Sequence, residues 1–245
     1  MRRRLGRLMS KMSRAVDFIA DFFFPNRCPF CDRFIPYNRL CCDECAVKTE
    51  RAEFCIRCGH HECQCGTQEI LYDGCATVIP YVTVGREAVL SLKYHYGFNT
   101  AKLLVPELVK KFENAGFLDE ADIITAVPMT ASRRYETGYN HAEYIAKTLS
   151  KQCGLPTSFN LIKKNKNAPL QHELTVAERM AEAKKSYANN PKISLNQMTV
   201  ILCDDIITTG STLNACAGVL KSMGAKKVYC AVLAGSYRNK NRNKE

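Results

Sequence analysis

The sequence lacks any long uninterrupted run of apolar residues. A helix that crosses a bilayer needs about 18 or more of them in a row, and the longest candidate, AVDFIADFFF at positions 15–24, is interrupted by Asp17 and Asp21. No cleavage site of small residues follows it, so it is not typical of a secretory signal peptide. These absences predict a cytoplasmic protein with no transmembrane segment.

Acidic residues are also few. The chain has 24 Asp and Glu against 35 Lys and Arg, which gives a formal net charge of +11. A charge of this sign attracts nucleic acid, phosphorylated metabolites or an anionic membrane face. Part of it lies in the Arg-rich start and in positions 238–244, so charge alone leaves nucleic-acid binding open. Because 46% of the residues are hydrophobic, the chain can build a core, which excludes wholesale disorder.

The first 25 residues have the pattern of a basic amphipathic helix that ends at Pro25. Apolar residues recur at helical spacing on one face, and basic residues lie on the other. The apolar stripe could pack on this protein, dock on a partner or lie on a membrane surface, and the sequence leaves these three open. No lipidation motif accompanies it. The apolar face has Leu5, Leu8, Met9, Met12, Val16, Ile19 and Phe23, and the basic face has Arg3, Arg4, Arg7, Lys11 and Arg14.

Cysteine, by contrast, is abundant and concentrated in one segment. Nine of the 14 cysteines fall between Cys28 and Cys65. In a chain expected in the cytoplasm, such a cluster favours a metal over disulfides. Two C-x2-C pairs, CPFC and CDEC, predict one tetrahedral zinc site that replaces a missing core, with Cys41 as a spare thiol. Its ligands would be Cys28, Cys31, Cys42 and Cys45.

A second cysteine-rich unit, CIRCG followed by HHECQC, predicts a second zinc site. Its C-x2-C half is typical of a zinc knuckle, whereas its C-x-C half is cramped. His60 or His61 could replace one cysteine, although we interpret both as exposed polar residues. Neither site has a vacant position for substrate water, so the zinc role is structural and residues 26–72 form a zinc ribbon module. The second set of ligands would be Cys55, Cys58, Cys63 and Cys65.

From residue 73 onward, short apolar segments alternate with helical patterns. This alternation predicts βαβ units around a parallel sheet over 73–245. Ligands in such sheets bind outside the carboxyl ends of the strands. The predicted fold class is therefore α/β, with a parallel-sheet domain preceded by a small cysteine-rich ribbon. We expect strands at 76–84, 122–127, 157–162, 199–203 and 227–234, and helices at 86–94, 102–114, 140–152, 174–187 and 211–223.

The segment VILCDDIITTGSTLNAC, residues 200–216, carries the chemistry. Asp204 and Asp205 follow a predicted strand, and burying two adjacent carboxylates is costly unless something pairs with them. The hydroxyls and amides of the next turn lie at a helix start, where they suit a phosphate, and Gly210 allows close backbone approach. Because carboxylates accept hydrogen bonds from a vicinal diol, the pair of features predicts a ribose phosphate. The phosphate cup would comprise Thr208, Thr209, Gly210, Ser211 and Thr212.

Two other interpretations of this segment are weaker. It is not a Walker loop, since it has no Gly-Lys-Ser/Thr. The aspartates could merely cap the next helix, but that explains neither the acid pair nor the Thr-Thr-Gly-Ser-Thr run.

VILCDDIITTGST resembles the 13-residue phosphoribosyl-diphosphate (PRPP) motif of type I phosphoribosyltransferases, with four apolar residues, two acidic ones and T-T-G-x-T. Together with the ribbon, the chain resembles the ComF family of competence-associated proteins along nearly its whole length. Similar segments are FFFPNRCPFC, SLKYHYG, AVPMT and RRYETGYNHAEYIAK, with Gln171, Arg179 and Tyr187 further on. It departs from the family in Thr137, where an arginine is usual, in Tyr139 for Phe and in His141 for Gln.

The resemblance implies a type I phosphoribosyltransferase-like domain that binds PRPP with Mg²⁺ and displaces diphosphate at C1 of the ribose. Asp204 and Asp205 would act on the ribose and its metal, and residues 208–212 would hold the 5′-phosphate. The missing arginine at Thr137 bears on diphosphate binding and hence on catalysis. For the diphosphate, the resemblance implies backbone N–H groups of Val127, Pro128 and Met129, and the counter-charges Lys93 and Arg134. No general base stands out among His95, His141 and His172.

Two functions from different classes follow. One is Mg²⁺-dependent phosphoribosyl transfer to a nucleobase or amine. The other, which the family implies physiologically, is a non-catalytic accessory role in DNA uptake, through single-stranded DNA, PRPP sensing and competence proteins. The acceptor, the partners and a homo-oligomeric state are left open.

Overall fold

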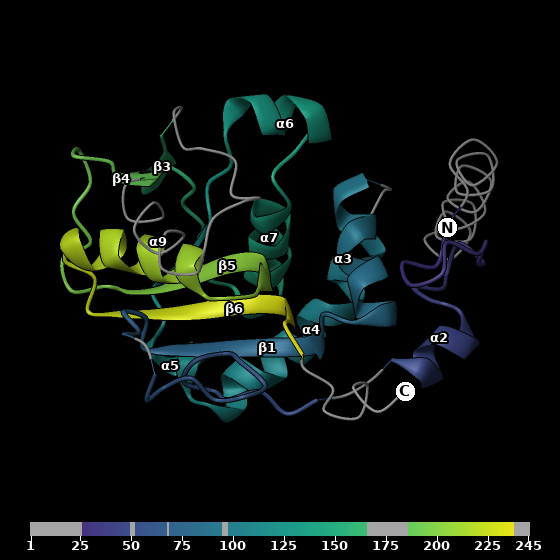
Figure 1. The fold of residues 1–245 in the computed structure, drawn as a ribbon. Helices are drawn as coiled ribbons and strands as arrows, with labels where there is room; N and C mark the ends of the chain where they lie inside the picture. Colours follow the sequence, from purple (N-terminus) through teal and green to yellow (C-terminus); the bar gives the residue numbers. More distant parts are fainter. Residues whose placement is uncertain (1–25, 50–51, 68, 95–97, 166–185, 238–245) are drawn as a thin grey trace, which may run out of the picture.

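A computed structural model describes residues 26–49, 52–67, 69–94, 98–165 and 186–237 (Figure 1). The predicted amphipathic helix at 1–25 lies outside the described residues, as do all but the last two positions of the helix predicted at 174–187. Within the described part of the chain, no helix is both long enough and apolar enough to cross a bilayer.

The centre of the fold is a four-stranded, fully parallel sheet, as the alternating pattern predicts. Its order is β1-β6-β5-β2. The strands are almost continuous apolar runs because both faces of the sheet are covered. Their bounds are β1 Gly74–Pro80, β2 Ile123–Ala126, β5 Thr199–Ile207 and β6 Lys227–Gly235.

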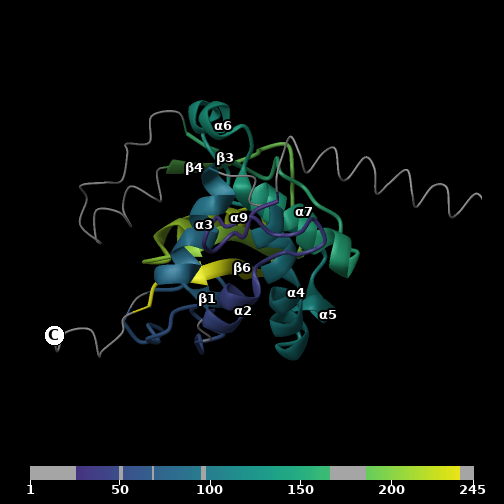
Figure 2. The same ribbon diagram turned by 90° about the vertical axis from the view of Figure 1, so that its right-hand side faces the viewer.

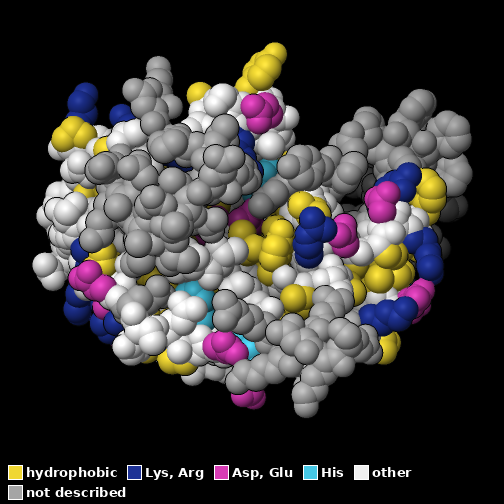
Figure 3. Space-filling model, viewed as in Figure 1, with side chains coloured by type: hydrophobic (Ala, Val, Ile, Leu, Met, Phe, Trp, Pro, Cys, Tyr) yellow, Lys and Arg dark blue, Asp and Glu magenta, His cyan; other side chains and the backbone are white. Residues whose placement is uncertain are grey.

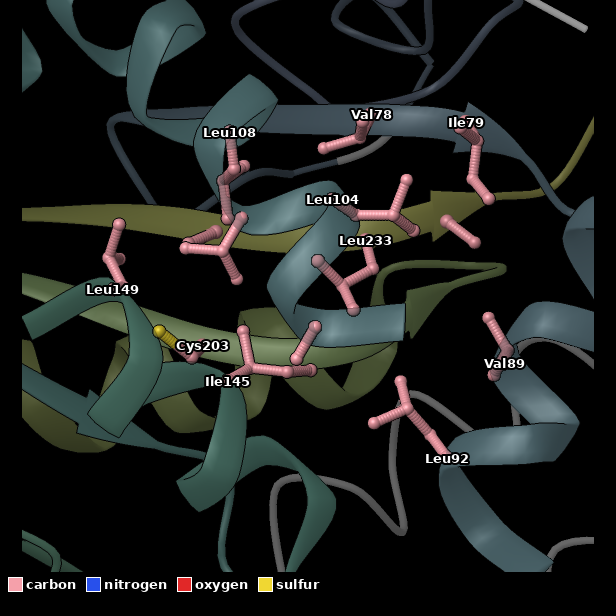
Figure 4. Packing of buried hydrophobic residues seen from close by; sticks show 14 of the residues in the cluster. Val78, Ile79, Val89, Leu92, Leu104, Leu108, Ile145, Leu149, Cys203 and Leu233 are labelled. Atoms are coloured by element: carbon pink, nitrogen blue, oxygen red, sulfur yellow. The ribbon is translucent and has the colours of Figure 1, made fainter. Parts of the chain in front are cut away.

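Residues of β5 alternate between two hydrophobic cores, because successive side chains of a strand point to opposite faces. Ile201 and Cys203 lie in the core beneath three helices, whereas Val200 and Leu202 lie in the core beneath α9. Figure 4 shows leucine and isoleucine side chains of α4 and α7 converging on β5 and β6 in the first core. The three helices are α3 Thr83–Tyr94, α4 Phe98–Asn114 and α7 His141–Cys153, and α9 is Ser211–Ser222.

Local signals place several of these elements. Helix α7 begins after Asn140, whose side chain accepts a hydrogen bond from the Ala142 N–H, and it ends at Gly154 in the left-handed region. Helix α4 begins four residues before the predicted start and contains Pro106. A proline inside a helix removes one backbone hydrogen bond, so the buried apolar face of α4 stabilises what its local sequence disfavours.

Several elements differ from the prediction. Strand β1 ends at Pro80 and α3 starts at Thr83, where we expected a strand to 84; Gly85 lies so close to the Pro80 carbonyl that a Cβ there would be 2.0 Å from it. The strand predicted at 157–162 is wrong, since Thr157 makes only an isolated bridge. A two-stranded antiparallel pair and three short helices were not predicted. These are β3 Ile162–Lys164 with β4 Tyr187–Asn189, and α2 Asp43–Lys48, α5 Phe117–Glu120 and α6 Ala131–Thr137.

The cysteine-rich segments pack on the sheet domain at two different places. Cys28, Phe30 and Cys45 extend the core formed with α3 and α4. The second cysteine segment instead lies along β1, where the Cys75 N–H donates to Ile56 O at 2.8 Å. The boundary at residue 73 remains a prediction, because core and hydrogen bonds both cross it.

Replacing Leu108 by alanine is expected to lower the free energy of unfolding by about 2–5 kcal/mol, since the side chain is fully buried under β1 and β6 and its removal leaves a cavity. The control is Leu103→Ala on the same helix, where the side chain is half-buried and the loss is expected to be smaller. Chemical denaturation of both variants measures the difference. Equal losses would contradict the packing of α4 described above.

Candidate functional site

A cavity lies where β5 extends beyond the end of β2. The structure extends β5 to Ile207, four residues beyond the predicted end, so that Asp204 and Asp205 lie within the strand. Its pairing with β6 continues to Gly235, whereas its pairing with β2 stops at Cys203. Among the described residues, no strand pairs with β5 on its β2 side beyond Cys203.

This cavity has a volume of about 280 Å³. Helix α6 and the β3–β4 pair lie together at one end of the molecule in both views (Figures 1 and 2). Both contribute residues to the cavity wall. Seven predicted site residues line it, namely Val127, Pro128, Met129, Asp204, Asp205, Thr208 and Thr212. Seven others complete the lining, namely Arg133, Asn140, His141, Ala142, Lys164, Tyr187 and Ile206.

The two carboxylates differ in environment. Asp205 is only 8% exposed, whereas Asp204 is half-buried. The Asp205 N–H donates to Asp204 Oδ1 at 2.9 Å. This hydrogen bond fixes the orientation of the Asp204 carboxylate. Carboxylate oxygens bind hydroxyl groups and hard cations, so a polar ligand or a cation would match this part of the cavity wall.

The turn between β5 and α9 supplies the groups that suit an anion. Gly210 is in the left-handed region (φ 73°) and gives α9 no side-chain cap. The amide dipoles of a helix start favour a negative charge. Thr208 and Thr212 line the cavity, whereas Thr209, Gly210 and Ser211 line a smaller hollow beside Tyr72 and Asn214.

One predicted source of backbone donors is corrected by the structure. The Val127 N–H donates to Cys203 O at 3.0 Å as a continuation of the β2–β5 ladder. Pro128 has no N–H, as for every proline. Of the three residues expected to donate to a diphosphate, only Met129 has an amide available for it. Asn140 holds this segment in place, because its Nδ2 donates to Val127 O at 3.0 Å.

The described cations that line the cavity are Arg133 and Lys164, whereas the sequence predicted Lys93 and Arg134. Arg134 forms an ion pair with Glu143, with 2.5 Å between Nη2 and Oε1, and it does not line the cavity. Its neighbour Arg133 does. Lys164 is a second cation of the wall, and burial, together with the charge of Arg133, lowers its pKa. The side chain of Lys93 lies outside the described part of the chain.

The first cysteine cluster has the geometry of a tetrahedral metal site. Its four Sγ atoms lie within 4.8 Å of one another. Zinc–sulfur bonds of about 2.3 Å place the sulfurs of a tetrahedron about 3.8 Å apart, and the distance between Cys31 Sγ and Cys42 Sγ is 3.8 Å. A backbone hydrogen bond from Cys45 lowers the pKa of Cys42 to about 7, which favours the thiolate that a metal needs. Cys41 lies outside the cluster, as predicted.

The second cluster fits a metal equally well and needs no histidine. Cys55, Cys58, Cys63 and Cys65 bring their Sγ atoms within 4.8 Å of one another, and Cys55 and Cys65 are 3.8 Å apart at Sγ. The cramped C-x-C half therefore closes the site. These residues could hold a second zinc ion that replaces a hydrophobic core in this small module.

The expectation that both histidines are exposed is wrong for His60. Its side chain is 2% exposed, and its Nε2 lies 3.2 Å from Thr208 O. His61 is only partly buried, with Nδ1 3.0 Å from Glu53 O. Neither belongs to a cysteine cluster.

Comparison with known proteins agrees with this geometry. The phosphoribosyl transferase domain model matches residues 139–245, which include β5, the turn and α9. Competence protein F of Haemophilus influenzae is 27% identical over 221 residues, covering 84% of this chain and 95% of that protein. The chain is a homologue of competence protein F. The DNA utilization protein YhgH of Escherichia coli is 22% identical over 205 residues, 82% of this chain and 86% of that one.

The homology confirms the resemblance to the ComF family and the α/β phosphoribosyltransferase-like fold. A purine phosphoribosyltransferase from Pyrococcus horikoshii superposes on 56% of this chain and 72% of that one, with 19% identity and a TM-score of 0.35. The assignment of the phosphoribosyltransferase-like fold rests on the domain match and the sheet order, not on this superposition.

Residues of the cavity wall were not predicted from the sequence for two reasons. Arg133 belongs to a helix of seven residues, too short for periodicity to tell its faces apart, although Thr130 could have been recognised as its N-cap. Lys164 and Tyr187 meet through the β3–β4 pairing, for which no local turn signal exists. Gln171, Arg179, His95 and His172 lie outside the described residues.

Proposed function

We propose that this protein binds PRPP or a related ribose phosphate in the cavity at the end of β5, and that with Mg²⁺ it transfers the phosphoribosyl group to an acceptor as part of DNA uptake. One observation carries the proposal: a single cavity has Asp204 and Asp205 on one wall and Thr208 and Thr212, at the start of α9, on another. A ribose with a 5′-phosphate has the complementary pair of groups.

The residues take distinct roles in this proposal. Asp204 and Asp205 accept hydrogen bonds from the ribose 2′- and 3′-hydroxyls, and residues 208–212 hold the 5′-phosphate through backbone amides and hydroxyls. The Met129 N–H, Arg133 and Lys164 face the diphosphate, whose charge matches the two cations. Arg133 thus takes the part assigned to Arg134 and supplies a cation near Thr137, where the family usually has an arginine.

The cavity also fits Mg²⁺ as a companion of the ligand. Carboxylate oxygens are the ligands that Mg²⁺ prefers, and it is commonly held by one or two of them together with substrate phosphates and water. Asp204 and Asp205 are the carboxylates in the cavity wall among the described residues. When bound, the ion supplies positive charge to the departing diphosphate.

A second candidate function is the handling of single-stranded DNA. It is favoured by the formal net charge of +11 and by the name of one relative, DNA utilization protein YhgH. On the face seen in Figure 3, however, the described Lys and Arg side chains are scattered among Asp and Glu rather than gathered in one stripe. A continuous basic groove is the usual electrostatic footprint of single-strand binding, so we rank this function second.

Calorimetric titration with PRPP in the presence of Mg²⁺ tests the first function. We expect saturable binding that free ribose 5-phosphate reproduces more weakly, and release of diphosphate when a nucleobase or amine acceptor is added. Binding without release under any acceptor would favour a PRPP sensor. No binding, together with single-stranded DNA affinity that falls steeply with salt, would replace the first function by the second.

Replacing Arg133 by glutamine is expected to weaken PRPP binding about tenfold, which corresponds to the loss of one charged hydrogen bond to the diphosphate. Binding of ribose 5-phosphate, which has no diphosphate, should change little. The matched control is Arg134→Gln, which removes the same charge from a residue paired with Glu143 outside the cavity wall. If Arg134→Gln has the larger effect in calorimetry, the assignment of Arg133 is wrong.

A further inference from the structure

One side chain links the second cysteine cluster to residues 208–212, which we call the phosphate turn. His60 follows Cys58 by two residues, and its Nε2 lies 3.2 Å from the carbonyl oxygen of Thr208, 148 positions away in sequence. Since a carbonyl only accepts, Nε2 carries the proton and donates. A Cβ at position 210 would lie 3.3 Å from His60 Cε1, so the ring also packs against Gly210.

The backbone of His60 is fixed within the cluster. The Cys55 N–H donates to His60 O at 3.0 Å, and the Gly59 N–H donates to Cys55 O at 2.7 Å. The ring is 2% exposed, and its Nδ1 has no hydrogen-bond partner among the described residues. Among the described residues, its polar contact outside the cysteine segment is the one with Thr208 O.

Three further hydrogen bonds hold the cysteine segment and residues 69–72 near this turn. Tyr72 Oη donates to Cys58 O at 2.9 Å. Asn214, in the first turn of α9, accepts from the Leu71 N–H at 2.6 Å and donates to Glu69 O at 2.8 Å. The first cluster has a different neighbourhood, since Cys28 and Cys45 pack in the core with α3 and α4.

Holding the Thr208 carbonyl has a direct consequence for anion binding. In a planar trans peptide the C=O and the next N–H point in opposite directions. His60 therefore also fixes the direction of the Thr209 N–H, which points away from the ring. Ser236, which directly follows β6, donates from Oγ to the same carbonyl at 3.1 Å. The Thr208 carbonyl therefore accepts one hydrogen bond from the end of the sheet and one from the cysteine segment.

We propose that His60 is a positioning residue through which the metal-filled second cluster, and not the first, orders the phosphate turn 208–212. The effect on ligand affinity rests on the function proposed above, whereas the effect on the order of the turn does not. Loss of metal from Cys55, Cys58, Cys63 and Cys65 would thereby weaken phosphate binding without changing any residue of the cavity.

Hydrogen–deuterium exchange of the full chain without ligand provides the first test. In His60→Ala the turn should open more often, so the amides of Ser211 and Asn214, which donate to Thr209 Oγ1 and Gly210 O, are expected to exchange about tenfold faster, which corresponds to one lost hydrogen bond. His60→Gln, whose amide can donate to the same carbonyl, should restore much of the protection. Equal exchange in wild type and His60→Ala, with metal content unchanged, would overturn the proposal.

A second test asks whether the effect comes from the cluster. Cys63→Ser and Cys31→Ser are matched variants, since both replace an exposed ligand, one in each cluster. We expect Cys63→Ser to speed exchange of the Ser211 and Asn214 amides, and Cys31→Ser to leave it unchanged. Adding Cys63→Ser to His60→Ala should speed it no further, whereas adding it to Ser236→Ala should. Equal effects of the two cysteine variants, or full additivity with His60→Ala, would refute the coupling.

Titration with PRPP and Mg²⁺ separates this proposal from the first. If the wild type binds PRPP, His60→Ala should bind it about tenfold more weakly and His60→Gln should recover. If the wild type binds no PRPP while exchange still depends on His60 and Cys63, the proposed ligand is wrong and the positioning role stands. Unchanged exchange together with wild-type PRPP affinity in His60→Ala would reject the positioning role alone.

Discussion

Replacing Asp204 and Asp205 together by asparagine is expected to weaken PRPP binding in the presence of Mg²⁺ by about 100-fold or more. Hydrogen bonds to charged groups contribute about 1.5–3 kcal/mol each, so two such groups account for about 3–6 kcal/mol, and every 1.4 kcal/mol is tenfold in affinity. Asparagine keeps the shape of the side chain, so the loss reports the charge that faces the ribose hydroxyls and the metal. Calorimetry with PRPP and Mg²⁺ measures it.

The fold of this double variant should survive. Asparagine keeps the shape of each side chain and an oxygen that accepts hydrogen bonds, so the melting temperature should change little. Asp119→Asn is the control. Asp119 is an exposed residue of α5, which comes just before β2. It therefore lies near the amino end of β2, whereas the cavity borders the carboxyl end of that strand. Undiminished binding in the double variant would show that the acid pair holds no ligand.

Features encoded within a few residues could be predicted from the sequence. The strand β6 differs from its predicted bounds by one residue, because an apolar run and Gly224 mark it locally. Helix α7 carries both its signals, Asn140 and Gly154, in its own sequence. The two cysteine clusters follow from spacing alone, because a knuckle brings two thiolates to one ion irrespective of the remaining fold.

Features that depend on distant parts of the chain could not be predicted. The extension of β5 to Ile207 comes from pairing with β6, and the end of β2 at Ala126 turns that extension into a cavity wall. Burial of His60 comes from packing of the cysteine segment on the phosphate turn. Its neighbours in sequence are polar, so composition pointed to solvent. The candidate site was thus located by its motif, while the identity of its cations depended on tertiary contacts.

Wild-type protein purified with zinc is expected to hold two zinc ions per chain, and Cys28→Ser or Cys58→Ser to hold one. In each cluster the four sulfurs lie within 4.8 Å of one another and one pair is 3.8 Å apart, the edge of a zinc–thiolate tetrahedron, so both sites suit a metal. Elemental analysis of the three proteins gives the stoichiometry. One ion in the wild type would mean that only one cluster binds metal.

The two serine variants should also unfold at much lower temperature, because structural zinc contributes about 10–16 kcal/mol to the folding of zinc-finger peptides. The loss here should be smaller than that, since Cys28 packs in the α3–α4 core and the segment of Cys58 is fastened to β1, so each module keeps contacts without its ion. Cys41→Ser is the matched control: Cys41 neighbours a ligand but lies outside the cluster, so this variant should keep both ions and its melting temperature. A loss of zinc from Cys41→Ser would assign the ligand to the wrong member of the Cys41–Cys42 pair.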